Sequence, residues 1–384
     1  MKIKILVLHV SVGHGMKITA ENIAHQLRKN PEYEVRIEDV QKIEKGILER
    51  TMVKIYSHLL EHFSGLWGFL YSSKVINFFA LRVRRPFAAI RSKRILSLLR
   101  EYQPAIVVST ETIPTGIVSY LKSKGLYRGK LAMAFSDYHL HEFWLYDQVD
   151  LYLCNIAEQA QKLKQLGVLA DKIVVIGATI SEKFLQPIVR EDACRELGLL
   201  TSMSTVLMTS GSLVRMSTKD NFLGLLRSPR SFQIVVLCGT NSRLKAELEQ
   251  ISPPSQHPVK ILGYINNMEK YMSASDVLVG KTGGPTMIEA VLKKLPMIMT
   301  DIRPGHELIN LEFLLKNQIV EYARIPREVL FLVEQVLDSK IRKNFVHAHK
   351  VIIKPDNAIS LLEALKPLHP EAAELKVSYY TNLG

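Results

Sequence analysis

The stretch Gly280-Lys-Thr-Gly-Gly-Pro-Thr-Met-Ile-Glu-Ala290, followed at 304–310 by Pro-Gly-His-Glu-Leu-Ile-Asn, decides the fold of this chain. Residues 276–281 are typical of a buried strand, Gly283 and Gly284 of a tight turn, and residues 287–294 of an amphipathic helix. A helix opened by glycines leaves backbone N–H groups unpaired at its positive end, which suits a phosphate or pyrophosphate. An ordinary strand–turn–helix, with glycines that serve only the turn, is the alternative.

Polar side chains on this stretch extend the candidate anion site to a nucleotide-sugar site. Glu289 lies about one turn inside the predicted helix, where its carboxylate can bind a sugar hydroxyl of the same ligand. The turn that follows the next strand adds further polar side chains, those of His306, Glu307 and Asn310. The phosphates are expected at the residues that open the helix, namely Gly283, Gly284, Pro285 and Thr286.

Short apolar runs alternate with helical patterns along the rest of the 384 residues. In the first half the apolar runs are 3–10, 105–110, 131–135, 150–154 and 173–176. After a break the pattern restarts with 206–210, 234–239, 259–264, 276–280 and 296–300. This alternation predicts an α/β fold of two Rossmann-like domains, each with a parallel sheet and right-handed crossovers. Ligands of such sheets bind at the carboxyl ends of the strands.

Several segments resemble one enzyme family over most of the chain. Residues 11–16, Ser-Val-Gly-His-Gly-Met, are similar to its glycine- and histidine-bearing acceptor loop, and residues 136–144 to a segment of the form Thr-Asp-aromatic-x-x-His…Trp. The most specific likenesses are Gly-Gly-x-Thr…Glu and Pro-Gly-x-Glu…Asn in the opening stretch. The family is that of the diacylglycerol glycosyltransferases: monogalactosyldiacylglycerol synthases and processive diacylglycerol glucosyltransferases. The peptidoglycan lipid-linked N-acetylglucosamine transferase is a more distant likeness.

This resemblance implies a glycosyltransferase-B fold, in which two Rossmann-like domains face each other across a cleft. Residues 1–180 would form the acceptor and membrane domain, with a C-terminal helix of about 356–384 packing back onto it. Residues 200–355 would bind the nucleotide sugar. The expected reaction is the inverting transfer of a hexose from a UDP-sugar to diacylglycerol or a glycolipid. The enzyme would be cytoplasmic and peripheral on the inner face of the cell membrane.

Loops after successive strands of the second domain supply the remaining donor-site candidates. They are Ser212 and Leu213 after the first strand, Gly239 and Asn241 after the second, and Tyr264 and Ile265 after the third. Tyr264 and Ile265 would hold the uracil through backbone hydrogen bonds and ring contact. Core packing for Tyr264 and a plain turn for Gly211-Ser212 are the alternatives.

A general base for the acceptor hydroxyl is expected in the first domain. His14 lies in a glycine loop after the first strand, and an unperturbed imidazole has a pKa suited to proton transfer near neutrality. Its alternatives are a cap on the next helix or a contact to the lipid's glycerol. Asp137 and His141 follow another strand and are the other catalytic candidates. His9, within the first strand, is expected to be a satisfied core histidine.

The chain departs from the family pattern at three polar positions. Met16 stands where related bacterial sequences commonly have a second histidine, Glu111 where a Thr-His pair has its histidine, and His306 where the family has glutamine. Two alternatives to diacylglycerol glycosylation therefore stay open. One is transfer to another lipid or polyprenyl acceptor, and the other is a non-catalytic lipid- or nucleotide-binding relative.

Composition narrows the class of protein. A hydrophobic content of 47% with 23% charged residues is typical of a globular chain. The three scattered cysteines predict a reducing compartment, and the apolar run at residues 2–8 is too short for a signal peptide. No Asp-x-Asp pair offers a carboxylate cradle for a divalent cation. We therefore expect no metal and no cofactor, with the UDP-sugar as donor substrate.

The net charge of +13 is concentrated near the N-terminal third of the chain. Between Glu61 and Glu101 there is no acidic residue, while eight basic ones occur: Lys74, Arg82, Arg84, Arg85, Arg91, Lys93, Arg94 and Arg100. Aromatic residues interleave with them, which favours binding in the interface of an anionic membrane. A solvated basic helix is the alternative. RNA binding is disfavoured because no nucleic-acid motif accompanies the charge, so no nucleic-acid partner is expected.

Overall fold

The computed structural model describes residues 2–10, 14–43, 74–136, 138, 140, 144–210, 216–251, 256–281, 284–302, 306–338, 345–355 and 358–370. Within these ranges only the backbone is described for residues 14–16, 74–83, 216–217 and 306. The chain divides into two compact units. Unit 1 comprises residues 1–179, 304–306 and 351–384, and unit 2 comprises residues 180–303 and 307–350.

Each unit is built on one six-stranded sheet in which every neighbouring pair is parallel. In spatial order the strands of unit 1 are β2 (Tyr33–Asp39), β1 (Ile3–His9), β3 (Ile106–Ser109), β4 (Lys130–Ala134), β5 (Leu151–Cys154) and β6 (Ile173–Val175). Those of unit 2 are β12 (Glu321–Tyr322), β11 (Met297–Met299), β10 (Val277–Gly280), β7 (Thr205–Thr209), β8 (Gln233–Leu237) and β9 (Val259–Leu262). The predicted α/β class is confirmed.

Strands β2 and β12 lie where the sequence predicts none. Both are edge strands, and β2 reads Tyr-Glu-Val-Arg-Ile-Glu-Asp, so charged residues interrupt its apolar ones. An edge strand accepts such charges because one of its sides has no neighbouring strand. Its place is fixed by long-range pairing, in which Val35 and Ile37 lie opposite Ile5 and Val7 of β1.

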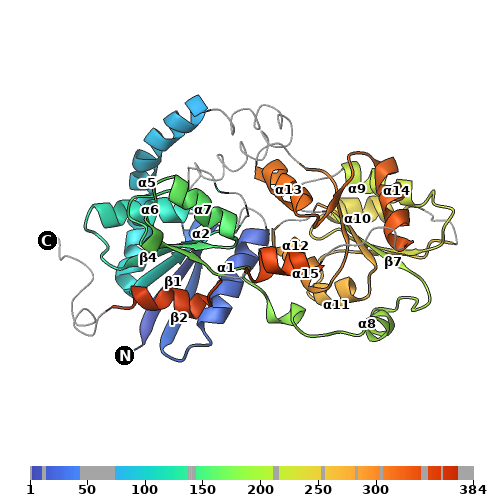
Figure 1. The fold of residues 1–384 in the computed structure, drawn as a ribbon, viewed down its shortest axis with the longest axis horizontal. Coiled ribbons are helices and arrows are strands. Elements are labelled where there is room, and N and C mark those ends of the chain that lie inside the picture. The colour runs from blue at the N-terminus through green and yellow to red at the C-terminus, as the bar shows by residue number, and fades with distance from the viewer. Residues whose placement is uncertain are drawn as a thin grey trace. The chain divides into compact units, whose positions relative to one another are not determined.

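The helices of unit 1 cover both faces of its sheet. They are α1 (His14–Leu27), α2 (Val40–Ile43), α5 (Lys74–Tyr102), α6 (Thr112–Ser123), α7 (Ala157–Gln165) and α16 (Leu361–Leu365). Figure 1 shows α5, α6 and α7 on one face and α1 on the other. Two apolar clusters follow from this arrangement, one beneath α5 to α7 and one beneath α1 and α16.

The last described α-helix, α16, belongs to unit 1 although it comes from the far end of the sequence. Leu361 and Leu365 are buried in the same cluster as Ile23 and Leu27 of α1. Ser360 caps the helix, because its hydroxyl oxygen accepts a hydrogen bond from the backbone N–H of Glu363. Residues beyond 370 lie outside the described part of the chain.

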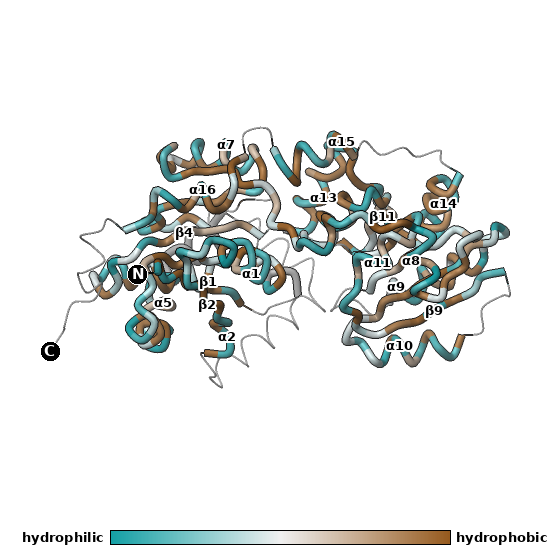
Figure 2. Tube along the Cα trace, turned by 90° about the horizontal axis from the view of Figure 1, so that it is seen from below, coloured by the Kyte–Doolittle hydropathy of each residue, from teal (hydrophilic) through white to brown (hydrophobic). Residues whose placement is uncertain are grey.

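The helices of unit 2 are α8 (Arg190–Leu197), α9 (Met216–Leu225), α10 (Ser242–Glu249), α11 (Met268–Ser273), α12 (Gly284–Leu292), α13 (His306–Lys316), α14 (Pro326–Leu337) and α15 (Phe345–Ala348). Figure 2 shows α10 and α14 alternating between hydrophilic and hydrophobic segments, as expected for helices with one face on a sheet. Their apolar side chains pack on strands β7, β8 and β10. Because all six strands are parallel, their carboxyl ends lie along one edge of the sheet, and the loops that follow the strands begin there.

Candidate active site

The strand order of unit 2 marks one place for a ligand. The first strand, β7, lies beside the fourth, β10, and the chain continues from them toward opposite edges of the sheet. In open α/β sheets ligands bind outside the carboxyl ends of the strands at this switch point. Ser210 follows β7 and Lys281 follows β10, so both lie at the switch point. The opening stretch of the sequence therefore lies where the fold places a ligand.

Gly280 ends β10 at a position where only glycine fits. Its φ is 142°, and a Cβ built on it would stand 2.2 Å from the carbonyl oxygen of Thr209. Gly280 and Thr209 are register partners on the two central strands. The glycine thus lets β7 and β10 approach closely at the switch point, a role that the sequence alone does not reveal.

Helix α12 begins at Gly284, earlier than the predicted start at residue 287. Pro285 follows at once, and proline is favourable in the first turn of a helix because no intrahelical partner awaits its missing N–H there. Gly284, Pro285 and Thr286 are all partly exposed. Anion binding at the N-terminus of α12 stays a prediction. Gly283 lies outside the described residues.

Glu289 lies on α12 in surroundings that disfavour its charge. Burial, with a smaller contribution from the nearby Glu269 carboxylate, raises the pKa of Glu289 to about 8. Because α12 starts early, Glu289 lies somewhat more than one turn inside the helix. A carboxyl group that holds its proton near neutrality is poised to change its charge when a polar ligand arrives.

The second predicted turn brings an ion pair to the same strand ends. Lys281 Nζ lies 2.5 Å from Oε1 of Glu307, and these side chains are only 19% and 17% exposed. Glu307 is in the first turn of α13, which also carries Asn310. The backbone of His306 begins this helix. Lys281 has no predicted role, although its place directly after a central strand could have suggested one.

The remaining donor candidates follow strands β7, β8 and β9 in the chain. Gly239 has a φ of 54°, and Asn241 caps α10 through an Oδ1 that accepts the backbone N–H of Leu244 at 3.0 Å. Tyr264 is 68% exposed, which excludes the core-packing alternative, whereas Ile265 is partly buried. Ser212 and Leu213 lie outside the described residues. Their roles, like those of the other site residues, stay predictions.

Unit 1 has its own switch point, between β1 and β3. Helix α1 begins at His14 just after β1, so the backbone of this residue lies at the expected edge, and its side chain is outside the description. Glu111 follows β3, and its Oε1 accepts a hydrogen bond from Oγ of Ser136 at 3.4 Å. Asp137 and His141, which follow Ser136 in the chain, lie outside the described residues.

His9 is buried as predicted, at 5% exposure, but it is not fully satisfied. In the described part of the chain its Nδ1 has no hydrogen-bond partner, and neither does Oδ2 of the buried Asp39. The two residues are register partners at the carboxyl ends of β1 and β2. Burial lowers the pKa of His9. Residues 11–13, which follow His9, are not described.

A cavity of about 540 Å³ in unit 1 lies apart from these strand ends. Val149 precedes β5 and Lys172 precedes β6, so this cavity opens toward the amino ends of those strands. Because ligands of α/β sheets bind at the opposite ends, we do not assign the reaction to it. Across the described ranges, no group of three or more His, Cys, Asp or Glu side chains is placed to hold a metal ion.

Both halves of the chain match models of glycosyltransferase families. Residues 17–180 match the monogalactosyldiacylglycerol (MGDG) synthase family, and residues 202–307 match the C-terminal domain of glycosyltransferase family 28. The chain is a relative of the diacylglycerol glycosyltransferases. The second match includes residues 280–290 and 304–307 of the stretch that predicts the donor site. The family prediction is confirmed.

Curated relatives cover most of the chain. Monogalactosyldiacylglycerol synthase 2 of Arabidopsis thaliana is 26% identical over 98% of this chain and 83% of its own length. The processive diacylglycerol beta-glucosyltransferase of Staphylococcus carnosus is 27% identical over 88% of this chain and 85% of its own. These diacylglycerol glycosyltransferases confirm the predicted enzyme class.

Solved structures support the fold alone, because their sequence identities are low. MurG of Acinetobacter baumannii has a TM-score of 0.61 and 12% identity, with 92% of this chain and 96% of that chain covered. MnaA of S. aureus, in a structure with UDP, has a TM-score of 0.57 and 11% identity, with 94% and 93% covered. The predicted glycosyltransferase-B fold class is confirmed.

Proposed function

We propose that this chain transfers a hexose from a UDP-sugar to diacylglycerol or a glycolipid, with inversion, at the cytoplasmic surface of a membrane. The observation that carries the proposal is the switch point of unit 2. After the central strand β10 come Lys281, which pairs with Glu307, and helix α12, which carries Glu289, all within a segment that matches the family 28 domain. The N-terminus of α12 suits a diphosphate, Glu289 a ribose and the Lys281–Glu307 pair a hexose.

In unit 2 the leaving diphosphate would lie at the N-terminus of α12. Backbone N–H groups fixed before the reaction stabilise charge as it develops on the leaving oxygen, without reorganisation. Glu289 would bind the ribose hydroxyls, and Glu307 with Asn310 would bind the hexose. Tyr264 and Ile265 would contact the uracil. The backbone N–H groups of α12 would thus bind the diphosphate, the carboxyl group of Glu289 the ribose, and that of Glu307 the hexose.

In unit 1 the acceptor hydroxyl would lie at the β1–β3 switch point. His14 at the start of α1 would take its proton as the hydroxyl attacks the sugar. Met16 has no basic atom in this pH range, so any histidine base on this loop must be His14. Asp137 and His141 are the alternative bases. The carboxylate of Glu111 follows β3 and would add negative charge near the proton that is transferred.

Radiolabelled UDP-glucose and UDP-galactose, offered with diacylglycerol-containing vesicles, test this proposal. We expect label to enter the lipid fraction with one of the two donors. UDP binding without label transfer would favour the non-catalytic alternative that Met16, Glu111 and His306 suggest. Transfer only to a polyprenyl lipid would replace the acceptor and leave the donor half of the proposal standing.

Membrane contact would come from the exposed face of α5. Ile90 is 77% exposed, and the neighbouring Lys93 and Arg94 are also exposed. An apolar side chain among cations suits the interface of an anionic membrane. Within the described residues, no helix is both long enough and apolar enough to cross a bilayer.

Not every basic residue of α5 is available for lipid. Nη1 of Arg84 donates a hydrogen bond to the carbonyl oxygen of Leu145 at 2.6 Å, and its guanidinium lies 4.7 Å from the ring centre of Tyr146. Arg85 is exposed and pairs with the exposed Asp147, an interaction of small net energy in water. Replacing Arg84 would therefore disturb packing. Arg85, Lys93 and Arg94 are exposed and can be replaced at lower cost, with the loss of one exposed hydrogen bond from Nη1 of Arg94 to the carbonyl oxygen of Ile43 at 2.9 Å.

We expect the triple variant Arg85→Ser, Lys93→Ser and Arg94→Ser to lose most of its binding to anionic vesicles. Each basic residue near such a surface contributes about 1 kcal/mol, and salt weakens this contribution. Vesicle co-sedimentation at two salt concentrations measures the effect. A control with the same charge change in unit 2, Arg195→Ser, Arg227→Ser and Arg243→Ser, should bind as the natural chain does. Equal losses in the two variants would contradict the assignment to α5.

A further inference from the structure

A buried ion pair stands where the donor would bind, and the proposed function gives a role to only one of its members. Lys281 directly follows the central strand β10, and its Nζ lies 2.5 Å from Oε1 of Glu307. More than four-fifths of each side chain is removed from solvent, since 19% and 17% remain exposed. Glu307 has the expected role of binding the hexose, whereas Lys281 has none.

Such a pair contributes little to stability by itself. Taking two charges out of water costs about as much as their attraction returns, and an apolar pair of similar size is often at least as stable. Removing one partner is costly, because it leaves the other charge buried and uncompensated. A ligand that takes the place of one partner avoids this cost. A buried pair at a binding site can therefore exchange partners.

The surroundings of each charge favour such an exchange. Lys281 lies three positions before the first residue of α12, and the N-terminus of a helix attracts the same anion that an ammonium group would bind. Glu307 lies in the first turn of α13, where the positive end of that helix stabilises a carboxylate. If the ammonium group moves to a phosphate, Glu307 thus keeps a favourable partner.

We propose that Lys281 binds the diphosphate of the nucleotide donor and that Glu307 holds the lysine until the donor arrives. Binding of the diphosphate draws the ammonium group away from the carboxylate. Glu307 then accepts hydrogen bonds from the hydroxyls of the sugar. Glu307 thus has two successive roles, first holding Lys281 and then binding the sugar. Recognition of the sugar therefore depends on the diphosphate being in place. This inference rests on the proposed function of unit 2.

The first test is the lysine. We expect Lys281→Met to weaken UDP binding by about tenfold or more, the scale for one charge-assisted hydrogen bond, and to leave uridine binding unchanged. Lys281→Arg should restore most of the affinity because it keeps a cation. Calorimetry measures the affinity for UDP, and ligand-observed NMR measures the affinity for uridine. The control is Lys294→Met, which removes an exposed cation just past the other end of α12 and should change neither affinity.

The second test has an unusual sign. Glu307→Gln removes the competitor for the ammonium group, so we expect UDP to bind several-fold more tightly while transfer from the UDP-hexose becomes slower. If Lys281 served only to hold Glu307 in place, both variants would slow transfer and neither would change UDP affinity selectively. That result, or weaker UDP binding by Glu307→Gln, overturns the exchange.

These outcomes separate this inference from the proposed function. A natural chain that binds no UDP contradicts the proposed function itself. A natural chain that binds UDP and transfers the hexose, beside a Lys281→Met variant with unchanged UDP affinity, contradicts only the role given to Lys281. Uridine binding retained by each variant shows that the pocket is still folded.

Discussion

His14→Ala is expected to lower turnover by ~10²-fold or more, the usual scale for the loss of a general base. The backbone of His14 lies at the β1–β3 switch point, at the start of α1. The glycines on either side allow a bulky acceptor to come close. Affinity for UDP should be unchanged, because the donor residues belong to unit 2. Steady-state transfer with the radiolabelled donor, together with calorimetry of UDP, measures the two quantities.

His25→Ala is the matched control for this variant. His25 lies on the same helix and its side chain is exposed, so the same substitution there should leave turnover close to normal. Near-normal turnover of His14→Ala would show that His14 is not the general base and would leave Asp137 and His141 as the candidates. Loss of UDP binding by His14→Ala would show that the division of donor and acceptor between the units is wrong.

Glu289→Gln is expected to change how UDP affinity depends on pH. The raised pKa of Glu289, about 8, means that the ligand-free protein holds this proton at neutral pH. If the ribose hydroxyls bind the carboxylate, donor binding releases the proton. Affinity should then rise between pH 6 and pH 8 by about tenfold more in the natural chain than in the Gln variant. The ionisation of UDP itself affects the natural chain and the Gln variant equally, so it cancels when their affinities are compared.

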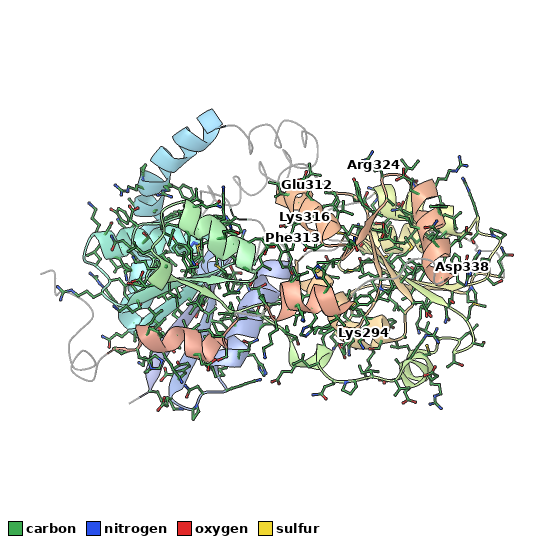
Figure 3. All side chains as sticks on the ribbon, in the orientation of Figure 1. Lys294, Glu312, Phe313, Lys316, Arg324 and Asp338 are labelled. Atoms are coloured by element: carbon green, nitrogen blue, oxygen red, sulfur yellow. The ribbon has the colours of Figure 1, made fainter. Side chains whose placement is uncertain are left out.

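Alanine at the same position tests the contact without reference to pH. At pH 8, Glu289→Ala should weaken UDP binding by roughly 1–3 kcal/mol, the cost of a lost charge-assisted hydrogen bond. Glu312, labelled on α13 in Figure 3, is exposed, and Glu312→Ala is a suitable control. An unchanged affinity of Glu289→Ala by calorimetry would remove Glu289 from the ribose site.

The same carboxyl group has a consequence for stability. Its pKa is about 8 in the folded chain and near the ordinary glutamate value when unfolded, so between those values only the folded state keeps the proton. Stability is therefore lost as pH rises through this window. Glu289→Gln should be less sensitive to pH there and more stable than the natural chain at pH 8. Chemical denaturation at pH 5 and pH 8 measures this difference.

The sequence by itself determined the two parallel sheets and the approximate start of helix α12. Buried parallel strands are short apolar runs whatever their neighbours, so 206–210 and 276–280 could be recognised as β7 and β10 from local pattern alone. The glycines and Pro285 likewise marked the start of α12 to within a few residues. The family resemblance added chemistry to a turn whose geometry the residues already indicated.

Only the tertiary structure decided which of these residues meet. Edge strand β2 depends on its pairing with β1 rather than on its own charged sequence. The raised pKa of Glu289 depends on what buries its side chain, and Glu269, which adds to it, is twenty positions away. Lys281 finds Glu307 because two strands end at the same edge of the sheet. Burial and charge pairing are set by neighbours distant in sequence, and no local pattern records them.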